Sequence, residues 1–191
     1  MPKPTASHFT NQKLAETFTL IADLLEIKGE IIYKTLAYRK AADSLTELGQ
    51  DVADIWGEEG LKGLQAIPGV GKAIAEKIEE LLETSELGFL NRLGEEVPLS
   101  LADILQIPGL GPKKVALFWK ELGITTLPEL ESAARAGKLR DLTGMGAKSE
   151  EKIIRGIEAL ARRSGRTPLG VAWPFAGELL AFLRGDRKSV V

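Results

Sequence analysis

The sequence predicts an all-α protein built from short amphipathic helices. Apolar residues recur at helical spacing along most of the chain, and turns containing glycine and proline interrupt them at short intervals. We find no run in which apolar and polar residues alternate as they do in a half-buried strand. With 191 residues, 44% of them hydrophobic and 27% charged, the chain is long enough for one sizeable domain or two small ones.

The composition argues against several kinds of site. The chain has no cysteine, which excludes disulfides and thiolate-bound metals, and its one histidine, His8, lies in a polar leader. No apolar run is long enough to cross a membrane, and residues 1–13 lack the apolar core of a secretory signal, so we expect a cytoplasmic protein without a membrane partner. The net charge of −2 does not favour nucleic-acid binding, which would have to depend on local patches or backbone groups.

Two long helices are expected first. Asn11 is a candidate N-cap for a helix that stops at Gly29, and the apolar residues of this helix are Leu14, Phe18, Ile21, Leu24 and Leu25. A second helix covers residues 30–48 and ends at Gly49. We expect this helix to direct three apolar side chains inward, namely Ile31, Leu36 and Leu45.

Shorter helices complete the chain, which reads as almost wholly helical. They are expected at 51–56 and 60–67, from about residue 72 to Glu83, and at 87–93, 101–107, 127–139 and 149–163. Pro98 and residues 164–168 are the best candidate boundaries between parts of the chain.

A turn of the form apolar-x-Gly-apolar-Gly occurs three times, and we call its copies the first, second and third hairpins (residues 67–71, 107–111 and 142–146). Each copy follows a short apolar helix and precedes a longer amphipathic one. Glycine permits positive φ, and the next helix begins with unpaired amides at the positive end of its dipole, which is an anion site. The candidate phosphate-binding residues are Gly69, Val70, Gly71 and Lys72 in the first copy, and Gly109, Leu110, Gly111, Lys113 and Lys114 in the second.

The alternatives differ between the copies. A single Gly-x-Gly often only caps a helix, but two strong copies with proline before glycine favour phosphate binding. The third copy is weaker and is either a degenerate structural repeat or a third contact. Residues 107–120 contain three lysines and no acid, whereas the helix after the first hairpin is mixed in charge. Binding of this kind should depend strongly on salt and little on base sequence.

Residues 33–42 (YKTLAYRKAA), 64–87 and 107–118 together resemble the N-terminal part of X-family DNA polymerases, the DNA polymerase beta type, and are closer to the bacterial members. The resemblance implies a lyase-type domain at 1–92 and a fingers- or thumb-like DNA-binding subdomain at 93–168. It also implies a monomer in base excision repair, whose first and second hairpins hold the downstream and primer strands of gapped or nicked DNA. Each hairpin of the family binds a monovalent cation, potassium or sodium, through main-chain carbonyls. The matching carbonyls are those of Gln65, Ile67, Val70, Leu105, Ile107 and Leu110.

The resemblance also implies a lyase site. Lys77 matches the lysine that forms a Schiff base with a 5′-deoxyribose phosphate, while Lys34 and Tyr38 match positions that contact the 5′-phosphate and shape the pocket. Two further phosphate-side lysines of the family are replaced by Gln65 and Ala73, which puts the activity in doubt. The alternative is that Lys77 is a surface lysine paired with its acidic neighbours.

Polymerase chemistry is not expected of this chain. Residues 169–185 resemble the first helix of the palm domain, and residues 186–191 are expected to be a non-native tail. The paired aspartates of a palm, which would bind magnesium and the deoxynucleoside triphosphate in the complete DNA-directed DNA polymerase, are missing. This chain would therefore be a DNA-binding portion, with at most 5′-deoxyribose-phosphate lyase activity. A helical protein-interaction module that has lost DNA contact is the remaining alternative.

Overall fold

The computed structural model describes residues 9–163, which form helices and no strand. These residues divide into two compact units, 9–96 and 97–163. The all-α prediction is therefore confirmed. The boundary between the units falls after Glu96, later than the expected division at 92/93, and the roles assigned to the expected domains stay predictions. His8, the palm-type helix at 169–185 and the tail at 186–191 lie outside the described residues.

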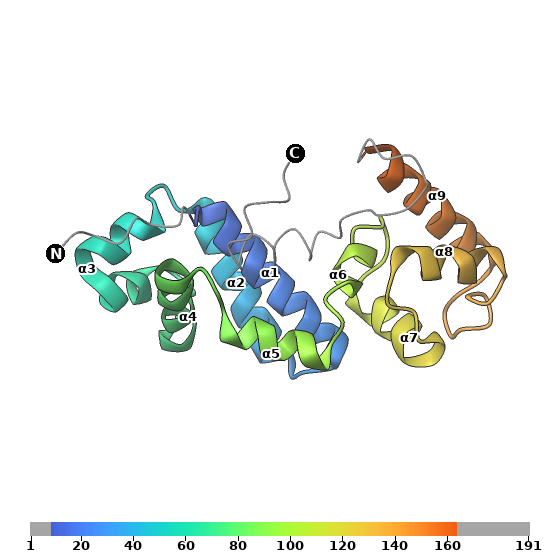
Figure 1. Ribbon diagram of the computed structural model, residues 1–191, viewed down its shortest axis with the longest axis horizontal. Helices are drawn as coiled ribbons and strands as arrows, with labels where there is room; N and C mark the ends of the chain where they lie inside the picture. Colours follow the sequence, from blue (N-terminus) through green and yellow to red (C-terminus); the bar gives the residue numbers. More distant parts are fainter. Residues whose placement is uncertain (1–8, 164–191) are drawn as a thin grey trace. The chain divides into compact units, whose positions relative to one another are not determined.

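The first unit starts with two helices that lie side by side (Figure 1), α1 (Asn11–Lys28) and α2 (Ile32–Glu47). The five apolar residues expected to face inward from α1 are all buried, because they follow the helical repeat. Arg39 of α2 ties the two helices together by hydrogen bonds to Asp23 at 2.7 Å and Glu26 at 2.9 Å.

The expected N-cap of α1 is wrong by one residue. Thr10 caps the helix, since its hydroxyl accepts a hydrogen bond from the Lys13 amide. Asn11 instead joins α1 to the segment after α2. Its side chain donates to the Gln50 carbonyl at 2.8 Å and accepts from the Val52 amide at 2.9 Å. A side chain that bonds across the fold in this way has no local sequence signal.

Two of the three residues expected to face inward from α2 are exposed. Leu45 is buried, but Ile31 is 63% exposed and Leu36 is 52% exposed. Ile31 precedes the helix in an extended conformation, so the helical repeat does not apply to it. Leu36 lies about 100° around the helix from Thr35, which begins the buried face. The buried residues of α2 are Thr35, Tyr38, Ala41, Ala42 and Leu45.

Three helices complete the first unit: α3 (Val52–Ala66), α4 (Lys72–Thr84) and α5 (Gly88–Glu96). Helix α3 is broken at Gly60, where φ is 61° and ψ is −146°, so the two separate segments expected there are confirmed. The first hairpin joins α3 to α4. The buried side of α4 includes Ile74 and Ile78, as its helical spacing predicted.

The second unit contains α6 (Leu101–Ile104), α7 (Pro112–Leu122), α8 (Leu127–Arg135) and α9 (Ala147–Arg163). Thr126 and Glu129 form a capping box at the start of α8. Helices α6 and α8 end earlier than the expected segments because the chain turns there, in α6 to enter the second hairpin and after α8 at Gly137 (φ 74°).

The helix of the third hairpin packs on the second hairpin. A Cβ on Gly156 of α9 would lie 2.6 Å from the Cγ2 atom of Ile107. Only glycine permits this approach, since real Cβ atoms do not come so close to another carbon. The core of this unit also includes Val115 and Phe118 of α7, both fully buried, as expected. The two hairpins of this unit are thus parts of one packed core.

Candidate nucleic-acid interface

The three hairpins share one backbone conformation. Gly69, Gly109 and Gly144 have positive φ angles of 80°, 84° and 76°. In each hairpin the amide of the next residue donates to the carbonyl three residues before it. The distances are 3.0 Å from Val70 to Ile67, 3.1 Å from Leu110 to Ile107 and 3.0 Å from Met145 to Leu142. The third copy, which has the weakest sequence match, therefore folds as the other two do.

The helices after the first two hairpins begin without a side-chain cap. Gly71 and Gly111 are the N-caps of α4 and α7, and neither has a side chain that could bond the first amides of its helix. In α7 the first helical residue is Pro112, which has no amide hydrogen. The remaining amides stand at the positive end of each helix dipole, which is the arrangement that binds phosphate.

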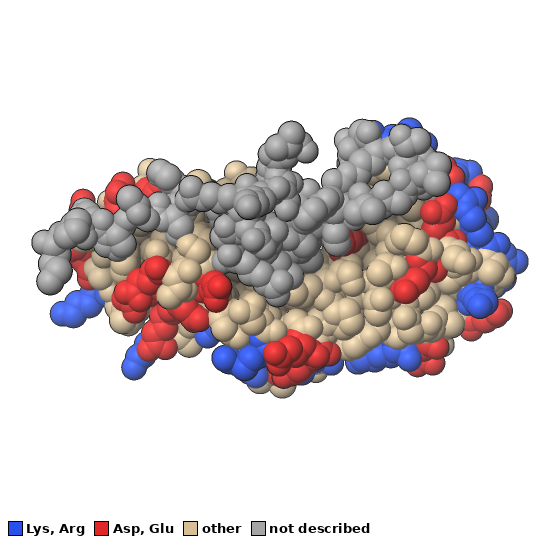
Figure 2. Space-filling model, in the orientation of Figure 1, with Lys and Arg blue, Asp and Glu red and all other residues tan. Residues whose placement is uncertain are grey.

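The charged residues near these two helix starts differ from those of the surface as a whole. Figure 2 shows acidic and basic side chains interspersed over the visible face, in keeping with the net charge of −2. At the second hairpin, Lys113 is exposed and the Lys114 ammonium donates to the Gly109 carbonyl at 3.2 Å. At the first hairpin, the Lys72 ammonium lies 3.9 Å from Glu76. The second hairpin therefore has the more basic surroundings of the two.

The third hairpin differs in the residue that faces the core. Ala75 and Val115 occupy the fourth position after the last hairpin glycine, and Glu150 takes this position in α9. All three are buried. The Glu150 carboxylate accepts hydrogen bonds from the Arg140 amide at 2.9 Å and from its Nε at 2.7 Å. A carboxylate in the first turn already interacts with the helix dipole, so this hairpin is less suited to a phosphate than the other two.

This pair should make stability depend on pH. Burial raises the pKa of Glu150, but the hydrogen bonds and charge of Arg140 outweigh burial and hold the pKa below its ordinary value of 4.5. A carboxyl whose pKa is lower in the folded state than in the unfolded state stabilises the fold at pH values above its unfolded-state pKa. This stabilisation is lost as the pH falls through the folded-state pKa. At neutral pH we expect Glu150→Gln to unfold at a lower urea concentration than the wild type. The difference between the two urea midpoints should narrow below about pH 4.5. An equal difference at every pH would contradict the charge-dependent role.

The first hairpin should tolerate a side chain less well than the second. Gly69→Ala and Gly109→Ala both place alanine at positive φ, which costs roughly 1–2 kcal/mol. Around Gly109 a Cβ would meet no atom within 4 Å, but at Gly69 it would lie 2.8 Å from the Cγ of Lys40. We therefore expect the larger loss of unfolding free energy for Gly69→Ala, measured by urea unfolding. Equal losses would show that Lys40 moves aside without cost.

The structure brings Lys77 and Tyr38 to one aromatic ring. The Lys77 ammonium lies 5.0 Å above the Phe89 ring and donates to the Ala73 carbonyl at 3.1 Å. Phe89 stacks on Tyr38 with ring centroids 5.9 Å apart, and Tyr38 lies 5.9 Å from Phe18. Burial raises the pKa of Tyr38 to about 12, so this phenol stays protonated at neutral pH. Sequence reasoning missed Phe89, which belongs to α5 and has no motif around it.

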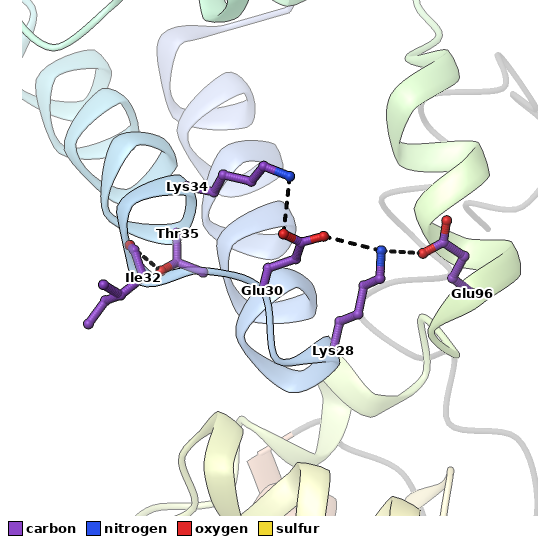
Figure 3. Close-up of polar contacts among 6 residues, drawn as sticks. All are labelled: Lys28, Glu30, Ile32, Lys34, Thr35 and Glu96. Atoms are coloured by element: carbon purple, nitrogen blue, oxygen red, sulfur yellow. Dashed lines mark hydrogen bonds and ion pairs between the residues drawn. The ribbon is translucent and has the colours of Figure 1, made fainter.

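Lys34 does not join this cluster. Its ammonium pairs with Glu30 at 3.1 Å, and Glu30 also contacts Lys28, which reaches Glu96 of α5 (Figure 3). The hydrogen bond from Lys34, followed by that from Lys28, holds the pKa of Glu30 below its ordinary value. Lys34 is exposed but already has an anionic partner, so binding a phosphate would require it to exchange Glu30 for the phosphate.

The hairpin carbonyls can accept a further ligand. The Ile67 and Ile107 carbonyls each accept one hydrogen bond within their turn, and a carbonyl oxygen has two lone pairs. One lone pair on each oxygen therefore remains, and the expected monovalent cation stays a prediction. Residues 9–163 hold no group of acidic or histidine side chains arranged to bind a metal ion.

No helix in the described part of the chain is long and apolar enough to span a membrane.

Comparisons with known proteins match both units. Residues 9–87 match the family model "Helix-hairpin-helix domain", and residues 101–159 match "SAM-like Helix-hairpin-helix tandem". The chain is 34% identical over 167 residues to the DNA polymerase/3′-5′ exonuclease PolX of Bacillus subtilis, an alignment that covers 87% of this chain and 28% of the relative. It is 29% identical to rat DNA polymerase lambda over 69% of this chain and 22% of that protein. It is also 28% identical to the DNA nucleotidylexotransferase of Ambystoma mexicanum, over 92% of this chain and 33% of that protein.

The chain is therefore a tandem helix-hairpin-helix protein. More specifically, it is related to the X-family DNA polymerases, and the resemblance seen in its motifs is confirmed. The chain spans a third or less of the length of these relatives, so what it shares with them is the part that contains the hairpins.

Proposed function

We propose that this chain is the DNA-binding portion of an X-family repair polymerase and that it holds gapped or nicked DNA without reading its bases. The observation that carries the proposal is the repeated hairpin, which places uncapped helix amides at the start of both α4 and α7. The first hairpin would hold the downstream strand and the second the primer strand. A potassium or sodium ion on the carbonyls of each turn would strengthen its attraction for phosphate.

DNA titrations at several salt concentrations test this proposal. Fluorescence anisotropy should show affinity for a gapped duplex with a 5′-phosphate above that for an intact duplex, and no change when the bases are permuted. The logarithm of the binding constant should fall linearly with the logarithm of the salt concentration. Absence of binding even at low salt would refute the proposal and favour a protein-interaction module. Replacing potassium by a bulky organic cation should weaken binding if the turns hold a metal ion.

A second candidate function is a 5′-deoxyribose-phosphate lyase. It is favoured by the contacts that Lys77, the candidate nucleophile, and Tyr38, the residue expected to shape its pocket, both make with the Phe89 ring. The neutral Lys77 amine would add to the C1′ aldehyde of the sugar, and loss of water would give an iminium ion. Removal of a C2′ proton would then break the C3′–O bond, so that the DNA strand leaves with its 5′-phosphate. Ala73 cannot provide the missing phosphate-side cation, however.

Borohydride trapping on gapped DNA with a 5′-deoxyribose phosphate decides between these alternatives. If the lyase is active, the wild type forms a covalent adduct, and both Lys77→Ala and Lys77→Arg lose it, since neither provides a primary amine. Lys77→Arg keeps the positive charge, so its DNA affinity should remain close to that of the wild type. Binding without any adduct would leave a gap-binding protein that has no lyase activity.

The remaining features of the proposal concern the complete protein. Its relatives are named as DNA polymerases or a nucleotidylexotransferase, and this chain would contribute DNA binding to an activity of that kind. Magnesium and the deoxynucleoside triphosphate would be bound by a palm domain, not by the residues described above. We place the protein in the cytoplasm as a monomer. Size-exclusion chromatography with light scattering checks the oligomeric state.

A further inference from the structure

The turn of the first hairpin is covered by a lysine from another helix. A Cβ on Gly69 would lie 2.8 Å from Cγ, 3.3 Å from Cδ and 3.4 Å from Cε of Lys40, a residue of α2. Three successive carbons of Lys40 therefore run along the bare side of the hairpin. The Lys40 side chain therefore lies in contact with the turn that leads into α4.

The second hairpin has a comparable lysine of its own. Lys114, three residues after Gly111, donates to the Gly109 carbonyl at 3.2 Å. The position three residues after Gly71 is Ile74, which is buried in the core of the first unit. The helix after the first hairpin therefore cannot present a cation from this position, and Lys40 reaches the corresponding glycine from outside the motif.

The other lysines near the first hairpin have partners. The Lys72 ammonium lies near Glu76, and the Lys77 ammonium bonds the Ala73 carbonyl and lies over Phe89. Within residues 9–163, Lys40 has no carboxylate within ion-pairing distance, and it is exposed. Its charge is therefore available to an anion without the loss of an existing ion pair.

We propose that Lys40 is a phosphate-contacting residue of the first hairpin and provides there the cation that Lys114 provides at the second. The inference rests on the proposed DNA binding, because the anion is a phosphate of the bound strand. The phosphate site would then comprise the amides at the start of α4 and the Lys40 ammonium. Lys40 belongs to α2, and α3 and the first hairpin lie between α2 and α4 in the chain. Glycine is required at position 69 for two reasons. Its φ angle is positive, and a Cβ there would clash with the Lys40 side chain.

The test compares Lys40→Ala and Lys40→Arg with Lys62→Ala, which removes an exposed lysine of α3 that lies outside the hairpins. Affinity for gapped DNA is measured by anisotropy at several salt concentrations. We expect Lys40→Ala to weaken binding about threefold to tenfold and to lower the salt slope by about one. Lys40→Arg should restore most of the affinity, and Lys62→Ala should leave both quantities close to the wild-type values.

The outcomes separate the role of Lys40 from the proposed DNA binding. Wild-type affinity and slope in Lys40→Ala would overturn the role of Lys40 while the proposed DNA binding stands. Equal losses in Lys40→Ala and Lys62→Ala would also overturn it, because the effect would then reflect overall charge. Absence of binding by the wild type would refute the proposed function, and the role of Lys40 with it. Urea unfolding of each variant shows whether a loss of affinity comes from loss of the fold.

Discussion

Charge reversal at the second hairpin, Lys113→Glu with Lys114→Glu, should reduce affinity for DNA about a hundredfold, or roughly 2.8 kcal/mol. Both side chains belong to the first turn of α7, where the amides point out of the hairpin, and residues 107–120 contain no acid to compensate them. The change removes two cations from the phosphate and adds two anions beside it. The slope of log affinity against log salt should fall by about two.

A matched control separates contact from overall charge. The double variant Lys120→Glu with Lys138→Glu changes the net charge by the same amount in the same unit, at exposed positions outside the hairpin turns. Affinity should then fall by only a few-fold through long-range repulsion, which salt screens. If both double variants lose the same affinity, the second hairpin is not a phosphate contact. If neither loses any, DNA binding does not involve this unit.

Phe118→Ala should cost about 3–5 kcal/mol of unfolding free energy, the largest stability change that we expect from a single substitution. Phe118 is fully buried in α7, and its carbonyl accepts a hydrogen bond from the Ile124 amide after the helix ends. Truncation leaves a cavity in the small core that also supports the second hairpin. Amide hydrogen exchange should become faster across residues 97–163, because local stability depends on this core.

Two comparisons show whether the loss is due to packing. Phe118→Leu keeps most of the volume and should cost less than about 1.5 kcal/mol. Protection of amides in residues 9–96 should be retained in both variants, because these residues form a separate compact unit with its own core. Loss of protection in both units at once would show that the chain unfolds as one cooperative body. A cost near zero for Phe118→Ala would mean that the second unit repacks around the cavity.

The sequence could predict the helices and the hairpins because their signals are local. The buried residues of α1 and α4 follow the helical repeat, and Gly69 and Gly109 mark the turns that interrupt it. The sequence could also have indicated that the third hairpin differs from the other two by a carboxylate at a buried position. Glu150 stands at a position where Ala75 and Val115 are buried, and a buried carboxylate needs a partner. That the partner is Arg140 depends on the loop before the hairpin and could not be predicted.

The sequence by itself determined the all-α class, the repeated hairpins and the relation to X-family polymerases, because helical periodicity, turn glycines and motif order are properties of neighbouring residues. The tertiary structure alone decided which side chains meet. Lys77 and Tyr38 both contact the Phe89 ring, and the Lys40 side chain from α2 packs against Gly69 of the first hairpin. These contacts join residues from different helices, and the packing of those helices, rather than any spacing along the chain, brings them within reach.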